Sequence, residues 1–122
     1  MKTKFIFNPT TGEFDKVTKQ LNASEILTST LTKTANYTIL AADNIIFVDS
    51  SGGAFDLTLP VPTALAGRIF RVIDKAGFLN TNNVTLIPSS TEKIEGLAAN
   101  KLLQTAWGWF NITTDGVDWY IG

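Results

Sequence analysis

The most constraining feature of this 122-residue chain is a series of short runs in which apolar residues alternate with threonine or other polar residues. The run 55–59 is typical, because every second residue is large and apolar, and Asp56 and Thr58 lie between them. A period of two places the apolar side chains on one face of a β-strand. Gly, Pro, Asn and Asp interrupt these runs at intervals of about ten residues. The pattern predicts an all-β fold of short strands.

Eight segments have this character from residue 37 onward. We expect strands at residues 37–40, 44–49, 54–59, 68–74, 84–87, 102–104, 106–113 and 118–121. The dipeptide Asp115-Gly116 is typical of a hairpin turn. Strand number and spacing together predict a small antiparallel β-sandwich or a barrel-like domain, and an interdigitated β-oligomer remains open as an alternative.

The first 36 residues differ from the rest. A hairpin is expected from strands at 4–7 and 13–17, joined by a turn that contains Pro9 and Gly12. Residues 18–36 carry few large apolar side chains, and both a short helix and an extended path remain open for them. We therefore divide the chain into an N-terminal hairpin and linker arm, residues 1–36, for attachment or oligomerisation, and a β-rich domain, residues 37–122.

Composition excludes several functional classes. The chain has no cysteine and no histidine, which removes thiolate metal sites, the commonest metal ligand and the commonest general base at neutral pH. Net charge is −1 with scattered lysines and arginines, so no footprint for nucleic acid is visible. The apolar stretch near the N-terminus is too short for a signal peptide or a membrane span. We expect no nucleic-acid partner, no membrane insertion and no cofactor.

The carboxylates are the remaining candidates for catalysis or metal binding. A glycosidase needs two of them about 5 to 10 Å apart across a sugar site, and nothing in the sequence places a pair in this way. Asp49, Asp74 and Asp115 each follow a strand, where an aspartate commonly caps a turn. Asp115 and Asp118 do not continue into a calcium-loop pattern. We expect no enzymatic activity and assign no catalytic, cofactor-binding or metal-ligating residue.

The three tryptophans are the side chains most suited to recognition. Trp107 and Trp109 are two residues apart, so on a strand they would share one face. Exposed indoles stack on sugar rings, whereas buried ones fill a core or a subunit interface. For Trp119, in the last expected strand, packing is favoured. Trp107, Trp109 and Trp119 are thus candidates for glycan binding or for an interface.

The strand segments also occur in a recognisable order. Their sequences are YTI at 37–39, DNIIFVD at 43–49, DLTLP at 56–60, GRIFRVID at 67–74, NNVTLIP at 82–88 and DGVDWYI at 115–121. This order and spacing resemble a module of phage tail-fibre, head-fibre and related virion proteins, over residues 37–122. The opening sequence FNPTTGEFD at 7–15 resembles a short hairpin at the start of various phage proteins.

The resemblance implies a non-enzymatic β-rich domain that assembles as a homotrimer at the end or along the shaft of a fibre. It leads us to expect a phage structural protein located in the virion, of the fibre or decoration type. Its expected partners are other copies of itself and, through the arm, other virion proteins. The alternative is a carbohydrate-binding, receptor-recognition module that uses a Trp107/Trp109 face, with a host surface glycan as ligand.

Overall fold

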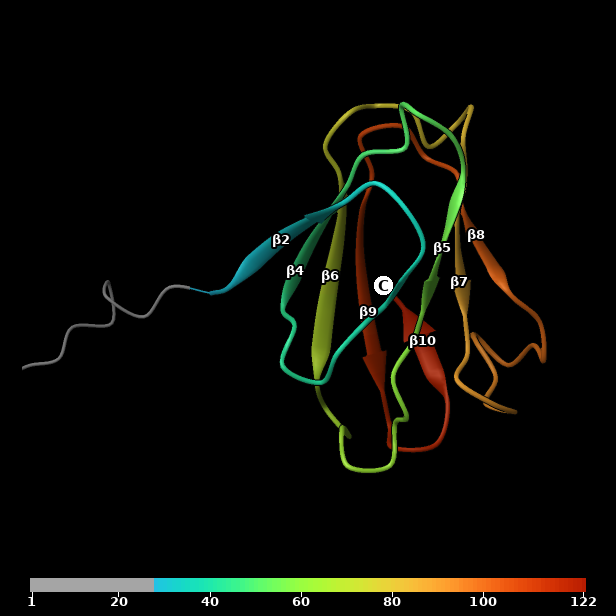
Figure 1. The fold of residues 1–122 in the computed structure, drawn as a ribbon. Helices are drawn as coiled ribbons and strands as arrows, with labels where there is room; N and C mark the ends of the chain where they lie inside the picture. The colour runs from blue at the N-terminus through green and yellow to red at the C-terminus, as the bar shows by residue number, and fades with distance from the viewer. Residues whose placement is uncertain (1–27) are drawn as a thin grey trace, which may run out of the picture.

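The computed structural model describes residues 28–122, and the expected hairpin at 4–17 lies outside them (Figure 1). The described part contains strands and no helix. The strands are β2 (Thr30–Lys33), β3 (Tyr37–Thr38), β4 (Ile45–Val48), β5 (Phe55–Thr58), β6 (Ile69–Asp74), β7 (Val84–Ile87), β8 (Lys101–Leu103), β9 (Trp109–Thr114) and β10 (Trp119–Ile121). The prediction of an all-β fold is therefore confirmed for the described residues.

These strands form two mixed sheets. The five-stranded sheet has the order β10-β9-β6-β4-β2, and the four-stranded sheet has the order β3-β5-β7-β8. From β2 to β7, consecutive strands enter the two sheets alternately, so the chain winds as a flattened coil (Figure 1). Neither sheet closes on itself, and the barrel alternative is wrong.

The expected antiparallel arrangement is also wrong for the first part of the fold. Four of the seven strand pairings are parallel, namely β2 with β4, β4 with β6, β3 with β5 and β5 with β7. Each of these strands pairs with the strand two places away in the sequence, because the intervening strand belongs to the other sheet. Antiparallel pairing begins with β8 and β9, and β9 and β10 flank the Asp115-Gly116 turn that predicted a hairpin.

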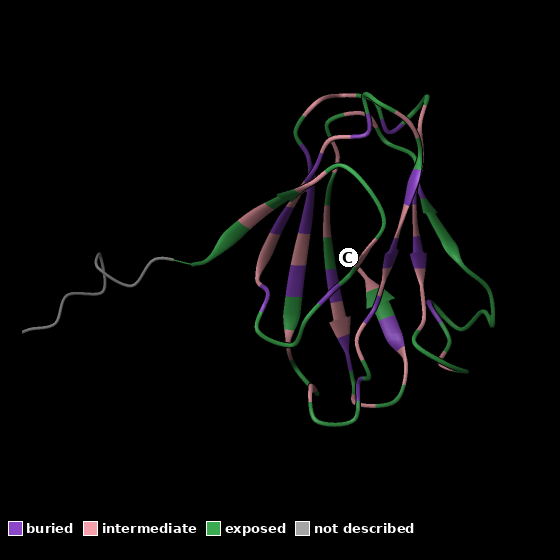
Figure 2. Cartoon of the chain, in the orientation of Figure 1, coloured by how far each residue is buried: buried purple, intermediate pink, exposed green. Residues whose placement is uncertain are grey.

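Both sheets bury one face in a common hydrophobic core (Figure 2). Parallel register aligns apolar positions across neighbouring strands, such as Phe55 with Val84 and Leu57 with Leu86. The largest completely buried side chains include Trp119 and Phe70, whose ring centroids are 6.0 Å apart. A core shared in this way explains why the apolar residues of the runs fall at every second position.

Strand β2 lies within the range 1–36 that the sequence assigned to the arm. It pairs with β4 along its whole length, and its Leu31 packs against the core. Residues 30–33 thus belong to the five-stranded sheet. The part of the range before residue 28 lies outside the described residues.

Candidate binding face on the five-stranded sheet

The face of the five-stranded sheet that points away from the core carries several large side chains. Its positions follow from the register, because along each strand they alternate with the residues that face the core. They are Thr30, Thr32, Ile45, Phe47, Ile69, Arg71, Ile73, Trp109, Asn111, Thr113 and Tyr120, of which Ile73 is itself buried. We call this set the outer face. Trp109 is 66% exposed and Ile69 is 54% exposed, so substantial apolar surface faces solvent there.

The corresponding face of the four-stranded sheet is more polar. Its outward positions are Thr38, Asp56, Thr58, Thr85, Ile87 and Leu102. Since exposed apolar surface commonly marks an interaction site, the outer face is the better candidate of the two.

Arg71 and Asn111 occupy the centre of the outer face. They are directly paired across β6 and β9, and Arg71 Nε donates a hydrogen bond of 2.9 Å to Asn111 Oδ1. The Arg71 guanidinium carbon lies 5.8 Å from the centroid of the Trp109 ring, within the range of a cation–π contact. No carboxylate of residues 28–122 forms an ion pair with Arg71. Within the described residues its two terminal nitrogens have no hydrogen-bond acceptor.

Arg68 provides an instructive contrast three residues earlier. Its Nη2 donates to the carbonyl oxygens of Ala41 and Asp43, each at 2.5 Å, and its Nη1 donates to Asn44 Oδ1 at 3.2 Å. These bonds tie the β3–β4 loop to the start of β6. The terminal nitrogens of Arg68 thus hold a loop in place, whereas those of Arg71 remain available to a ligand.

Trp107 lies outside β9, which begins at Trp109. The premise that both indoles project from one strand is therefore wrong. Trp107 belongs to the turn before β9 and has a positive φ of 61°. Its indole lies over Gly77, where a Cβ atom would collide with the ring, yet it remains 64% exposed. A glycine at position 77 is needed for this close approach.

Asp74 connects the Trp107 turn to the β6–β7 loop. It is buried, and its carboxylate accepts hydrogen bonds from four backbone N–H groups, those of Ala76, Gly77, Leu79 and Trp107. Burial by itself would raise the pKa of Asp74, but these four donors outweigh it and lower the pKa below the usual value of 3.8. The carboxylate is therefore ionised at neutral pH and holds the turn that carries Trp107.

Other carboxylates also serve local turns. Asp49 accepts hydrogen bonds from the backbone N–H and the hydroxyl of Ser51, which lower its pKa. Asp115 accepts hydrogen bonds from the backbone N–H groups of Asp118 and Val117, which lower its pKa in the same direction. The predicted turn-capping roles of Asp49, Asp74 and Asp115 are confirmed by these bonds.

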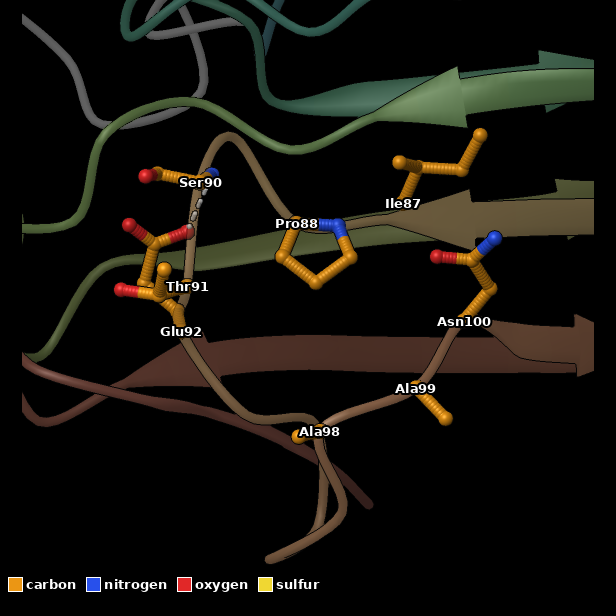
Figure 3. A pocket seen from close by; sticks show the side chains of 8 residues that line it. All are labelled: Ile87, Pro88, Ser90, Thr91, Glu92, Ala98, Ala99 and Asn100. Atoms are coloured by element: carbon orange, nitrogen blue, oxygen red, sulfur yellow. Dashed lines mark hydrogen bonds between the residues drawn. The ribbon is translucent and has the colours of Figure 1, made fainter.

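A second candidate is a hollow of about 330 Å³ beside the end of β7 (Figure 3). Its lining combines apolar residues with Glu92, whose carboxylate accepts hydrogen bonds from Ser89 and from the backbone of Ser90. Those bonds close the turn that contains Glu92. The hollow offers one carboxylate, and that carboxylate is already hydrogen-bonded within its own loop. The outer face is therefore the better candidate for a functional site.

Trp119 has a different environment from the other two tryptophans. It is completely buried against Phe70, and its indole nitrogen has no hydrogen-bond partner among the described residues. It therefore has no exposed surface on which a ligand could stack. Of the three tryptophans identified from the sequence, the structure leaves Trp107 and Trp109 accessible within this chain.

Comparison with models of known protein families finds no match, and comparison with curated proteins finds no significant relative. In residues 28–122 no group of three acidic side chains could hold a metal ion. The same part of the chain has no helix long and apolar enough to cross a membrane.

Sequence reasoning did not identify Arg71 and Asn111. A charged residue at the middle of the otherwise apolar run IFRVI at 69–73 was a signal that one face of this strand is exposed. Its pairing with Asn111 depends on the register between strands about forty residues apart, which the sequence does not reveal.

Proposed function

We propose that this chain is a structural module of a phage particle, of the tail-fibre, head-fibre or decoration type, built as a two-sheet β-sandwich and assembled as a homotrimer. The order of strand segments from residue 37 to 122 supports the comparison with fibre modules. In this proposal the chain attaches to other virion proteins through its N-terminal arm and is not an enzyme.

The observation that carries the proposal is that both sheets end in open edges. In the described residues, β2 has no neighbour on one side of the five-stranded sheet, and β3 and β8 have none on one side of the four-stranded sheet. At the other end of the five-stranded sheet, the backbone of Trp119 in β10 is hydrogen-bonded to Lys93 and Glu95, which cover part of that edge. Open edges favour pairing with another chain. A cyclic trimer uses a heterologous contact, in which one edge of each copy meets a different edge of the next, so no edge of that type is left unpaired.

Strand β2 is the edge best placed for this contact, because it lies nearest to the arm. The carbonyl oxygens of Ser29 and Lys33 accept hydrogen bonds from the β4 side, at 3.2 and 3.0 Å. Backbone groups alternate in direction along a strand, so those of Thr30 and Thr32 point away from β4. Thr32 thus offers an outward N–H to a neighbouring chain.

We expect the purified chain to have a mass of about three times 13.3 kDa in native mass spectrometry or light scattering. Thr32→Pro should convert it to a monomer with unchanged β circular dichroism, because proline removes an outward N–H and is tolerated at an edge. Thr32→Val keeps the N–H and is the matched control, which should remain trimeric. A wild-type monomer at micromolar concentration would contradict the proposed assembly.

A second candidate function is glycan binding, and the exposure of Trp107 and Trp109 favours it. Flat indoles on a rigid sheet are suited to stacking on pyranose rings. Because Trp107 is in a turn, the binding face in this proposal is centred on Trp109 and the outer face. Binding of a host surface glycan would be compatible with the structural role, since the oligomer contact is assigned to the strand edges.

A further inference from the structure

We infer that the glycan recognised by the outer face is acidic, and that Arg71 binds a carboxylate carried on the sugar ring. This inference rests on the second proposed function, glycan binding at Trp109, and specifies the class of sugar. Arg68, just before β6, and Arg71, on β6, differ in the partners of their side chains. The terminal nitrogens of Arg68 bind backbone carbonyls, whereas those of Arg71 have no acceptor in the described residues.

The Arg71 guanidinium is already positioned for a ligand. The bond from its Nε to Asn111 holds the group on the sheet, and the two terminal nitrogens are left as a planar pair of donors. Such a pair matches the two oxygens of a carboxylate. Arg71 lies on β6, which is flanked by β4 and β9, so the backbone that carries it is fixed on both sides.

Trp109 supplies the surface for the sugar ring beside this donor pair. Its indole is 66% exposed, and its ring centroid lies 5.8 Å from the Arg71 guanidinium carbon. In this inference the pyranose stacks on the part of the indole that the guanidinium leaves uncovered, and one of its substituents reaches the guanidinium. A carboxylate attached directly to the ring, as in a uronic acid, has the appropriate reach.

The charge of the outer face is complementary to an acidic ligand. None of its eleven outward positions carries an aspartate or glutamate. Lys75 follows β6 directly, and its Nζ lies 5.9 Å from the centroid of the Phe47 ring, so a second cation adjoins the face. Lys75 also interacts with the carboxylate of Asp49, so Arg71 is the main positive charge of the face. The carboxylate of Asp115 approaches the face only at its β10 edge, where Tyr120 donates a hydrogen bond of 3.3 Å to it.

The test is calorimetric titration of the full chain with hexagalacturonate, with its methyl ester, and with hexaglutamate. The ester keeps the same sugar rings without the charge, and the peptide keeps carboxylates without the rings. The variants are Trp109→Ala, Arg71→Gln and Arg71→Lys. Lys93→Gln, which removes one positive charge from an exposed side chain elsewhere, is the matched control.

We expect hexagalacturonate to bind at least about tenfold more tightly than its ester, because a hydrogen-bonded charge pair is worth an order of magnitude or more in affinity. Arg71→Gln should abolish this preference by lowering the affinity for the acid to that for the ester, and Arg71→Lys should restore the preference in part. Trp109→Ala should weaken binding of both sugars. The control Lys93→Gln should behave as the wild type.

Two results would overturn the inference in distinguishable ways. Equal binding of acid and ester, both dependent on Trp109, would refute the acidic class and leave glycan binding intact. Binding of neither sugar, or equal binding of hexaglutamate, would refute glycan binding at this face as well.

Discussion

Trp119→Ala is expected to destabilise the fold by about 3–5 kcal/mol, the usual cost of removing a large buried aromatic side chain. Trp119 is completely buried and packs against Phe70 in the core. Alanine would leave a cavity between the two sheets that the surrounding strands can fill only in part. Urea unfolding followed by circular dichroism, at one fixed protein concentration, measures the change.

Two further variants test whether the loss of stability comes from the buried indole. Val117→Ala, at a position 66% exposed, should change the free energy of unfolding by less than about 0.5 kcal/mol. Trp119→Phe should cost less than Trp119→Ala, because it keeps most of the ring volume and removes an indole N–H that has no partner within the described residues. A Trp119→Ala variant as stable as Val117→Ala would show that the indole is not part of the core.

Asp74→Asn is expected to cost about 2–4 kcal/mol, because a buried carboxylate that serves four N–H donors is replaced by an amide with a single acceptor oxygen. The same variant should alter the fluorescence of Trp107, since Asp74 accepts the hydrogen bond from the Trp107 backbone N–H. Asp49→Asn, at an exposed turn, is the control and should have a much smaller effect on unfolding.

The pH dependence of stability follows from the lowered pKa of Asp74. Its stabilisation is fully present above the ordinary carboxyl pKa of 3.8 and is lost as the pH falls through the lower pKa of the folded state. The urea midpoint of the wild type should therefore decrease below about pH 4. The urea midpoint of Asp74→Asn should decrease less over the same pH range. The lowered pKa values of Asp49 and Asp115 account for the decrease that remains. A variant with the same acid dependence as the wild type would contradict this role of Asp74.

Much of the secondary structure could be predicted, because the alternation of apolar and polar residues indicates a strand and shows which of its faces is buried. The run 55–59 predicted both the strand β5 and its buried face. Pairing could not be predicted in the same way, because alternation reveals which face is buried but not which strand lies alongside. The turn after β4 indicates a change of direction, yet the chain crosses to the other sheet there instead of forming a hairpin.

The candidate site was predicted only in part, for a related reason. Trp107 and Trp109 have the spacing of a shared strand face, but the turn at Trp107 and the contact of its indole with Gly77 break the strand. The most informative contact of the site, from Arg71 to Asn111, joins two strands through their register. Only a fold that specifies the register brings these two side chains together.

The central proposal is a structural role in a phage particle, and its most direct test is quantitative mass spectrometry of gradient-purified particles released from cells that express this chain. We expect its peptides to copurify with the particles at a copy number that is a multiple of three. Abundant peptides in the infected-cell lysate, together with their absence from intact particles, would contradict the account.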